Sequence, residues 1–351
     1  HRDVVAMLTL GIDSGSTTPK GALVDGEKVV RTAILPTSAN PKESIGRLYQ
    51  MLYNQDVAYT VSTGYGRELL DQADKQITEI TCHARGAAFL NPNVRAVVDI
   101  GGQDCKAILL DNGLNVVDFI MNDKCAAGTG RFIEVMMRIL EEDINNIDQF
   151  VQGHQPINIT SMCTVFAESE IVSLLAKGAD KGDIALGIIN SICRRTSFFA
   201  QKLNLTGEIF FSGGLARFEI FRSTLESYLK IPVSTSPLSQ YAGAIGAAVI
   251  GFNKAKRMQA KNKTAKRTCQ FCWQVLFYCF FILSSPPAGN HYPRTGWRWL
   301  PVPLPSPSLW TSSPLPESLH NTDRTAARLK RCCRSPRSRR TPHRYKKYHW
   351  G

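Results

Sequence analysis

The sequence contains no apolar run long enough to cross a membrane. Its most apolar stretch, residues 271–283, spans 13 residues, whereas a membrane-spanning helix needs roughly 20. No apolar run precedes residues 8–12, which are expected to form the first strand, so a signal peptide is not indicated. We therefore expect a cytoplasmic protein with no membrane partner, in which Met7 is the natural start and residues 1–6 are surplus.

Acidic residues are almost absent from the last part of the chain. Residues 254–351 contain 20 Lys or Arg and only 2 Asp or Glu, a net charge of +18, whereas residues 1–253 contain 22 and 27, a net charge of −5. All five Trp and 11 of the 18 Pro also lie in the last segment. The net charge of +13 therefore reports on this segment and not on the partners of the rest.

This C-terminal segment, residues 254–351, shows no periodic pattern that would build a core. We expect it to be disordered, and its abrupt change of character also fits translation in a shifted or foreign reading frame. Its Arg-rich run leaves nucleic-acid binding as an alternative, although such runs are commonly solvated tails. Our prediction is that the protein has no nucleic-acid partner.

Five cysteines in the first 253 residues, without an export signal, fit a reducing compartment in which thiols bind metal or pack. Two of them precede predicted helices, Cys125 in NDKCAAGTGRF and Cys163 in MCTVFAESE, where the helix dipole favours a thiolate. A [4Fe-4S] cluster usually takes four thiolates, so two per subunit suggest one cluster shared across the two-fold axis of a homodimer. Cys82 and Cys193 lie on predicted helices and are interpreted as core thiols.

A turn suited to phosphate follows the first expected strand. Residues 8–12 run into an Asp/Gly/Ser-rich stretch, after which residues 20–24 are expected to form the returning strand of a hairpin. Gly15 permits a tight turn, and Asp13 would face a metal ion that accompanies the phosphates. Hydroxyl and ammonium donors come from Ser16, Thr17 and Lys20. By itself this pattern also fits an ordinary polar turn.

The same pattern recurs later in the chain. Residues 95–100 form a second expected strand, followed by Gly101, Gly102, Gln103 and Asp104, and then by a return strand at residues 106–110. Two such units suggest duplicated halves, residues 7–92 and 93–253, that grip a nucleotide between them. A third glycine pair, Gly213 and Gly214, follows an expected strand at residues 208–211 and opens a helix, a place suited to the nucleoside or an α-phosphate.

The remaining segments indicate an α/β fold. Residues 57–63 are expected to form a strand, and residues 241–252 are rich in small residues, so they should pack closely on a neighbouring element. Apolar positions at helical spacing predict helices at residues 44–53, 68–72, 81–90, 130–140, 168–177, 184–203 and 216–229.

Six motifs then identify a family resemblance that covers residues 7 to about 253. In chain order they are GIDSGSTTPKG, DIGGQDCKA, NDKCAAGTGRF, MCTVFAESE, FSGGLA and YAGAIGAAVIG. Together they resemble the ATP-dependent activators of 2-hydroxyacyl-CoA dehydratases and, more distantly, the ATPase subunits of benzoyl-CoA reductase. Phosphate turns of this kind occur throughout the actin, Hsp70 and sugar-kinase superfamily, whereas the two cysteine motifs in that setting are typical of the activators.

The resemblance implies a duplicated ribonuclease-H-like fold with ATP in the interdomain cleft. It further implies one [4Fe-4S] cluster per homodimer, held by the residues that match Cys125 and Cys163. The implied activity is ATP hydrolysis coupled to the transfer of one low-potential electron to a 2-hydroxyacyl-CoA dehydratase. A low-potential ferredoxin or flavodoxin is the expected electron donor.

The resemblance also implies which residues would contact the nucleotide. The first turn would contribute Ser16, Thr17, Thr18, Pro19 and Lys20, and the second Gly101, Gly102 and Gln103. The nucleoside side would be lined by Gly213, Gly214, Gln240 and Gly243. Chemistry alone assigns Asp13 and Asp104 as the catalytic carboxylates that hold Mg²⁺ and water.

Cys105 departs from the family pattern and would set a thiol beside the nucleotide. It is either a small side chain tolerated in a strand or an oxidation-sensitive brake on hydrolysis.

Two other functions compete with the activator. In a small-molecule kinase of the same superfamily, Asp104 would act as general base and the cysteines would only pack. No inserted sugar-binding segment is visible to support it. A nucleotide-gated binding protein of the Hsp70 type would need a peptide-binding or filament-forming addition, for which the tail is a poor candidate.

Overall fold

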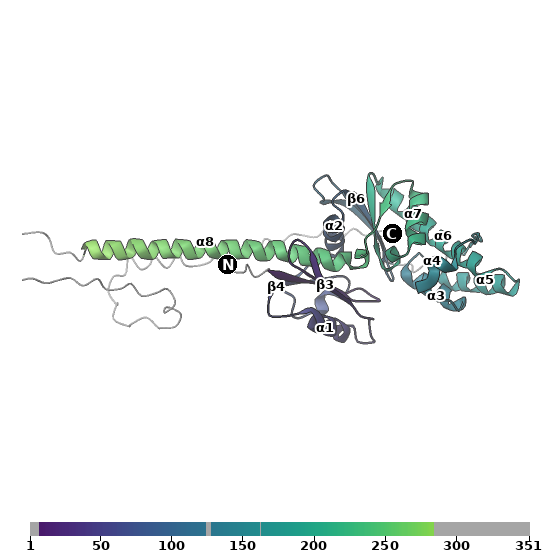
Figure 1. The fold of residues 1–351 in the computed structure, drawn as a ribbon, viewed down its shortest axis with the longest axis horizontal. Helices are drawn as coiled ribbons and strands as arrows, with labels where there is room; N and C mark the ends of the chain where they lie inside the picture. The colour runs from purple at the N-terminus through teal and green to yellow at the C-terminus, as the bar shows by residue number, and fades with distance from the viewer. Residues whose placement is uncertain (1–6, 124–127, 162, 284–351) are drawn as a thin grey trace, which may run out of the picture. The chain divides into compact units, whose positions relative to one another are not determined.

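Two five-stranded sheets organise the protein (Figure 1). The computed structural model describes residues 7–123, 128–161 and 163–283, and these belong to one structural unit. In the first sheet the strand order is β3-β2-β1-β4-β5, with β1 and β2 antiparallel and β1 and β4 parallel. Its strands are β1 (Leu8–Asp13), β2 (Lys20–Val24), β3 (Val29–Ile34), β4 (Val57–Thr63) and β5 (Lys75–Gln76).

The second sheet repeats the first strand for strand. Its order is β8-β7-β6-β9-β10, again with a central strand that has antiparallel neighbours on one side and parallel neighbours on the other. This repeat confirms the predicted duplicated α/β fold. Its strands are β6 (Val94–Ile100), β7 (Cys105–Leu110), β8 (Val116–Asn122), β9 (Glu208–Gly213) and β10 (Val233–Ser234).

Helices cover both faces of both sheets. No described helix combines the length and the apolar character that a membrane span requires. The helices are α1 (Pro41–Leu52), α2 (Glu79–Leu90), α3 (Gly130–Ile139), α4 (Ile147–Phe150), α5 (Thr164–Ala176), α6 (Lys181–Ala200), α7 (Glu219–Leu229) and α8 (Ala242–Leu283).

Each half sends its last helix onto the sheet of the other half. Helix α2 follows the first sheet in sequence, yet Ala84 and Ala87 pack against Val97 and Phe210 of the second sheet. Helix α8 follows the second sheet and packs against β1, β2 and β4 of the first. The outer faces are covered locally, the first sheet by α1 and the second by α3, α5, α6 and α7. The two halves are therefore joined through a crossing of α2 and α8.

That crossing depends on glycine. A Cβ placed on Gly86 of α2 would lie 1.9 Å from the carbonyl oxygen of Ala242, and one on Gly246 of α8 would lie 1.8 Å from that of Cys82. Real side chains never come so close to backbone atoms. The small residues of 241–252 thus do pack closely on a neighbouring element, as their composition predicted.

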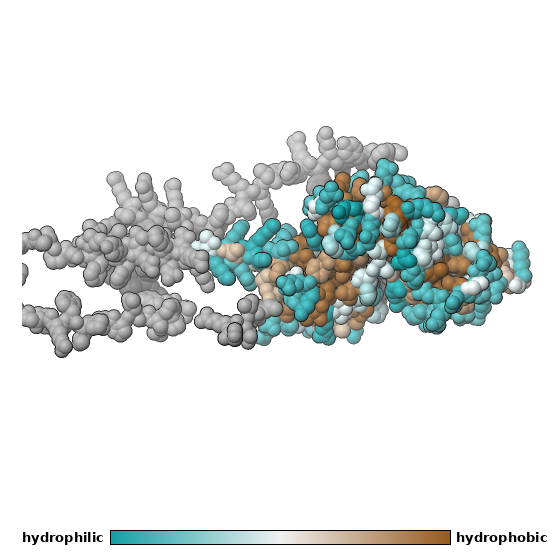
Figure 2. All heavy atoms as spheres, turned by 45° about the horizontal axis from the view of Figure 1, so that its top comes forward, coloured by the Kyte–Doolittle hydropathy of each residue, from teal (hydrophilic) through white to brown (hydrophobic). Residues whose placement is uncertain are grey.

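Helix α8 continues well past the predicted end of the folded part. We expected disorder from residue 254, but the helix runs to Leu283. No Gly or Pro interrupts residues 252–283, so a helix anchored at its start can propagate through Lys, Ala, Arg and Gln, which are good helix formers. Polar side chains cover the part of α8 that leaves the core (Figure 2), and residues 256–264 are all exposed.

The sequence analysis missed the edge strands. Strands β3 and β8 lie at the open edges of the two sheets and have mixed burial, so they lack the buried apolar pattern that identified the central strands. The helix predicted at residues 68–72 is a short 3-10 turn, Arg67–Leu69. The helix predicted at residues 216–229 begins at Glu219, because a 3-10 turn at Gly214–Arg217 and an extended Phe218 precede it.

The helix crossing yields a stability prediction. Gly246→Ala should lower the free energy of unfolding by about 1–3 kcal/mol, because its methyl group can be accommodated only by moving α8 away from α2. Urea denaturation followed by circular dichroism measures this change. Gly46→Ala is the matched control, since Gly46 lies in α1 with nothing within 4 Å of its added Cβ, and it should stabilise by about 0.5–1 kcal/mol. Equal stability of the two variants would contradict the proposed tight crossing.

Candidate functional site

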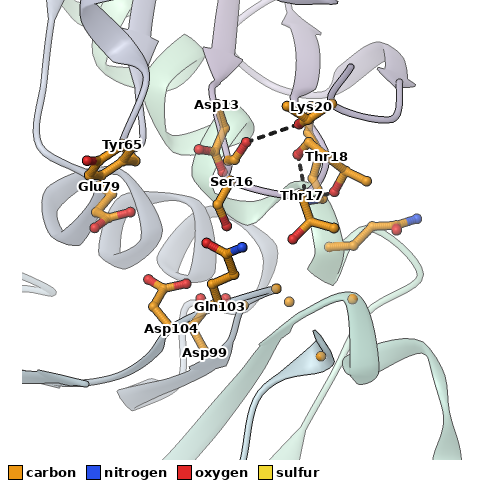
Figure 3. A pocket seen from close by; sticks show the side chains of 18 of the residues that line it. Asp13, Ser16, Thr17, Thr18, Lys20, Tyr65, Glu79, Asp99, Gln103 and Asp104 are labelled. Carbon is orange, nitrogen blue, oxygen red and sulfur yellow. Dashed lines mark hydrogen bonds between the residues drawn. The ribbon is translucent and has the colours of Figure 1, made fainter. Parts of the chain in front are cut away.

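A cavity of about 1090 Å³ lies between the two sheets, where the hairpin turns of both halves meet (Figure 3). It is lined by all the residues predicted for the nucleotide site except Pro19, which is buried, and Gly243. The lining residues that were predicted are Asp13, Ser16, Thr17, Thr18, Lys20, Gly101, Gly102, Gln103, Asp104, Gly213, Gly214 and Gln240.

Two glycines lie close against the Asp13 carboxylate and leave room for it. A Cβ on Gly64 would lie 2.5 Å from its Oδ1, and one on Gly243 would lie 2.4 Å from its Oδ2. Gly243 therefore makes room for Asp13 from behind instead of lining the cavity. Among the described residues the Asp13 carboxylate forms no hydrogen bond and no ion pair, so its oxygens can bind a ligand from the cavity side.

Lys20 supplies a positive charge that no carboxylate neutralises directly. Its Nζ donates to Thr18 Oγ1 at 2.8 Å and to the Thr18 carbonyl at 3.2 Å (Figure 3). Lys20 forms no ion pair within the part of the chain that the structure describes. Burial lowers the pKa of this ammonium group, although the charges of Asp13 and Asp99 partly oppose the effect. An anionic ligand in the cavity would therefore stabilise its charged form.

Two buried hydroxyl groups beside the cavity lack partners. Within the described residues, Ser14 Oγ and Thr17 Oγ1 have no hydrogen bond, and a buried hydroxyl without one is costly. Thr17 also lies directly against the second turn, since a Cβ on Gly102 would be 1.8 Å from its Oγ1. Unsatisfied donors, a lysine and two touching glycine turns together fit the oxygens of a polyphosphate.

The second turn contains a buried charge network that the sequence analysis did not identify. Lys106, which is 3% exposed, contacts the Asp104 carboxylate and lies 3.1 Å from Asp99 Oδ2 and 3.7 Å from Glu79 Oε2. Asp99 Oδ1 also accepts a hydrogen bond from Ser212 Oγ at 2.6 Å and lies 3.4 Å from His83 Nε2. The network joins α2, β6, β7 and β9 at the base of the cavity.

The network shifts the proton affinities of its members. Burial alone would raise the pKa of Asp99, but the Lys106 ammonium and the His83 ring outweigh it and hold that pKa below its usual range. Burial would likewise lower the pKa of Lys106, but Asp99, Asp104 and Glu79 together raise it. Glu79 has a raised pKa because its burial exceeds the stabilisation from Lys106.

Strand register is the signal that could have found these residues. In the first half Asp13 pairs with Lys20 across the hairpin, and in the second half Asp99 pairs with Lys106 in the same way. The repeat therefore makes Asp99, and not Asp104, the counterpart of Asp13. Asp104 does line the cavity, as predicted, but its carboxylate is engaged by Lys106.

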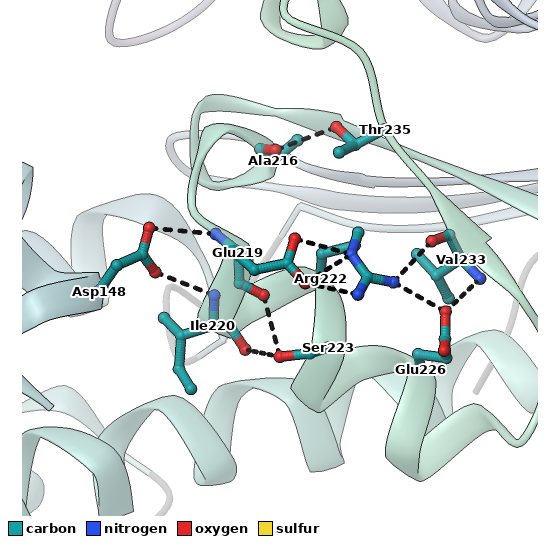
Figure 4. Close-up of polar contacts among 9 residues, drawn as sticks. All are labelled: Asp148, Ala216, Glu219, Ile220, Arg222, Ser223, Glu226, Val233 and Thr235. Carbon is teal, nitrogen blue, oxygen red and sulfur yellow. Dashed lines mark hydrogen bonds and ion pairs between the residues drawn. The ribbon is translucent and has the colours of Figure 1, made fainter. Parts of the chain in front are cut away.

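Helix α7 follows the third glycine turn, and its first turn is capped by Asp148 (Figure 4). Gly213 has a φ of +97°, which a side chain would disfavour. Asp148 accepts hydrogen bonds from the backbone N–H groups of Glu219 and Ile220, at 3.2 and 2.9 Å, and so caps the first turn of the helix. Thr235 Oγ1 donates to the Ala216 carbonyl at 3.0 Å and holds the connecting loop.

The two cysteines predicted as metal ligands differ in what can be described. Cys125 lies outside the described residues. Cys163 occupies the position directly before α5 and is exposed, whereas Cys82, Cys105 and Cys193 are buried. Burial raises the pKa of Cys82 to about 12, and Cys193 is raised by the same cause. These two are core thiols, as predicted, and Cys163 does not line the cavity.

Helix α3 begins at the second turn of the cavity. The N–H groups of Gly130 and Arg131 donate to the carbonyls of Gly101 and Gly102, each at 2.9 Å. Cys105 Sγ donates to the Gly128 carbonyl at 3.0 Å, and its 5% exposure fits the packing interpretation. The same turn therefore lines the cavity and is hydrogen-bonded to the first residues of α3.

The charge network yields the second prediction. Lys106→Met should lower the free energy of unfolding by about 3–5 kcal/mol, because it leaves Asp99 buried without its ammonium partner. Lys42→Met is the control, since Lys42 and Asp71 form an ion pair between side chains that are 59% and 69% exposed, and it should change stability by less than about 1 kcal/mol. Urea denaturation of both variants checks this. Similar losses in the two would show that the Lys106 network does not stabilise the fold.

Comparison with known proteins points to an ATPase family. A sequence-family model described as the BadF/BadG/BcrA/BcrD ATPase family matches residues 10–251. The (R)-2-hydroxyglutaryl-CoA dehydratase activating ATPase of Acidaminococcus fermentans is 42% identical over 261 residues, which cover 72% of this chain and 100% of the relative. An uncharacterized protein of Escherichia coli, YjiL, is 48% identical over 245 residues, which cover 69% of this chain and 96% of that protein.

A solved structure supports the same assignment. The activator of the 2-hydroxyisocaproyl-CoA dehydratase from Clostridium difficile, with bound ADPNP, superposes with a TM-score of 0.69 at 38% identity. The match covers 73% of this chain and 98% of that one. The predicted resemblance and fold are thereby confirmed. The chain is an ATP-binding protein and belongs to the BadF/BadG/BcrA/BcrD ATPase family.

Proposed function

We propose that this protein activates a 2-hydroxyacyl-CoA dehydratase as a homodimer that carries one [4Fe-4S] cluster. ATP hydrolysis in the cavity would be coupled to the transfer of one electron to the dehydratase, with a low-potential ferredoxin or flavodoxin as donor. The observation that carries the proposal is the start of α3. This helix follows Cys125 in sequence and is hydrogen-bonded to the turn that lines the ATP cavity.

The exposed surface beside Cys163 supports a homodimer. Val165, Phe166 and Val172 of α5 are 66%, 68% and 53% exposed, and Phe198 of α6 is 66% exposed. Apolar side chains gathered at one exposed place commonly mark an interface. A second copy bound across a two-fold axis would cover this surface and bring a second Cys163 to the first.

The donor set fits the cluster. Two thiolates from each subunit, those of Cys125 and Cys163, would hold it, and the Cys163 thiol is exposed directly before the first residue of α5. The cluster would supply a centre that accepts and donates one electron at low potential.

The charge of the cavity supports Mg²⁺ as a partner of ATP. Carboxylates that line it outnumber lining cations by seven to three: Asp13, Glu68, Glu79, Asp99, Asp104, Asp123 and Glu134 against Lys20, Lys106 and Arg217. A triphosphate alone would be repelled by such a surface, whereas a divalent cation would offset both sets of charges. We propose that Asp13 and Asp104 hold the ion and its water molecules.

The nucleotide would then lie along the three turns. Ser16, Thr17, Thr18 and Lys20 would bind phosphate oxygens from the first sheet, and Gly101, Gly102 and Gln103 would bind them from the second. Gly213, Gly214 and Gln240 would line the nucleoside side. Pro19 and Gly243 would contribute by shaping the turn and by admitting Asp13.

Nucleotide state and cluster would be coupled through the second turn. If the phosphates shift Gly101 and Gly102, the hydrogen bonds to Gly130 and Arg131 must move α3 or break. Thermodynamic linkage makes such coupling reciprocal, with free energies on the order of 1–3 kcal/mol.

The cluster can be tested by anaerobic purification. We expect a brown protein with about four irons per dimer and loss of the iron in Cys163→Ser, which removes two of the four thiolates. Cys82→Ala should keep its iron, because Cys82 is fully buried and packs against Val61 and Ala247. Iron analysis and the visible spectrum give the answer. A colourless wild type that phosphorylates a small alcohol would instead support the kinase alternative.

The coupling can be tested at Gly102. In Gly102→Ala the new methyl group would collide with Thr17 and push the two turns apart. ATP affinity should fall by roughly 5- to 150-fold, which corresponds to a cost of about 1–3 kcal/mol, and the midpoint potential should no longer differ between ADP and a nonhydrolysable ATP analogue. Gly46→Ala serves as control. A wild-type response of the potential to nucleotide in Gly102→Ala would exclude this route of coupling.

A further inference from the structure

Glu170 binds the backbone that leads to Cys163. Its Oε1 accepts hydrogen bonds from the Thr160 N–H at 3.0 Å and from the Thr160 hydroxyl at 2.9 Å, and its Oε2 accepts from the Ser161 N–H at 2.8 Å. Glu170 lies in α5, the helix that Cys163 precedes. Through both carboxylate oxygens of Glu170, α5 therefore binds the loop that directly precedes it.

Arg195 of α6 binds the same loop from the other side. Its guanidinium group donates to the Ser161 carbonyl at 2.6 Å and lies over the Phe132 ring of α3, 5.8 Å from the centroid. A Cβ built on Gly128 would lie 4.0 Å from Arg195 Cβ. Arg195 thus binds Ser161, two residues before Cys163, and lies near Gly128, three residues after Cys125.

Both backbone polar groups of Ser161 are therefore hydrogen-bonded to charged side chains. Its N–H is bound by a negative charge and its carbonyl by a positive charge, while residues 155–161 belong to no helix or strand. Hydrogen bonds to charged groups are roughly twice as strong as those between neutral groups. Because this loop has no regular secondary structure, the hydrogen bonds with Glu170 and Arg195 are what fix its backbone at residues 160–161.

A neighbouring pair of residues shows that the arrangement is specific. Glu168 lies two residues before Glu170 on the same helix, and Arg194 lies directly before Arg195, yet both are exposed and neither contacts the loop in the described hydrogen bonds. If these helices required only a charge of the same sign, Glu168 and Arg194 would serve as well as Glu170 and Arg195. The geometry singles out Glu170 and Arg195.

We propose that Glu170 and Arg195 are positioning residues that clamp residues 160–161 and so fix where Cys163 presents its thiol to the cluster. The inference rests on the proposed function, since it assigns to Cys163 the role of a ligand. Outer residues of this kind typically change metal affinity by 10- to 100-fold when they are replaced. Their charges would also act on the cluster: Glu170 would disfavour, and Arg195 would favour, its more negative reduced form.

The test compares Glu170→Gln and Arg195→Gln with the controls Glu168→Gln and Arg194→Gln, all as full-length, anaerobically prepared protein. The rate of iron transfer to a ferrous chelator should rise at least about tenfold in the first two variants and stay at the wild-type value in the controls. The midpoint potential should shift upward in Glu170→Gln and downward in Arg195→Gln. General loosening of the fold would move both potentials in one direction.

Two results would overturn the proposal: iron loss no faster than in the controls, or potentials that shift the same way in both variants. If wild-type protein holds no iron, the cluster proposal fails, and amide hydrogen exchange of metal-free protein decides the clamp separately. Exchange at Thr160 and Ser161 should then be faster in Glu170→Gln than in Glu168→Gln. Equal exchange in the two would overturn the clamp as well.

Discussion

The crossing of α2 and α8 is the contact on which the rest of the structure depends. Gly86 and Gly246 let the two helices approach until backbone meets backbone, and each helix covers the sheet of the opposite half. The same two helices carry residues of the site. His83 of α2 reaches Asp99, and Gly243 of α8 leaves the space that Asp13 occupies. The crossing therefore also supports the positions of Asp13 and Asp99, one in each half.

The internal repeat shows how one hairpin serves two purposes. Asp13 with Lys20 and Asp99 with Lys106 occupy the same register in their respective sheets. Their surroundings differ, because Lys106 is neutralised by three carboxylates whereas Lys20 contacts only Thr18 in the described hydrogen bonds. One copy is therefore suited to bind an anion and the other to hold acidic groups in fixed positions. The two hairpins therefore share their geometry and differ in the side chains that surround the lysine.

Local patterns in the sequence predicted the parts that depend on nearby residues. Buried central strands and glycine turns have strong local signals, so β1, β6, β9 and the glycine turns that follow them were predicted correctly, as was the close packing of residues 241–252. Features that depend on distant residues were missed. Asp99 and Lys106 are recognisable only when the two halves are aligned, and Glu170 only when the loop before α5 is seen to fold back on it. Strands β3 and β8 gain their pairing from the sheet and not from their own composition.

A series of contacts runs from the cavity to Ser161, two residues before Cys163. The carbonyls of Gly101 and Gly102 hold the start of α3, Phe132 of α3 lies under Arg195, and Arg195 holds Ser161, which Glu170 holds in turn. Most of these contacts are directional hydrogen bonds to backbone atoms, which cannot slide without breaking. A displaced turn must therefore either carry α3 with it or lose bonds that contribute about 0.5–1.5 kcal/mol each. Because Arg195 contacts both Phe132 of α3 and the Ser161 carbonyl, a movement of α3 would be transmitted to the loop before α5.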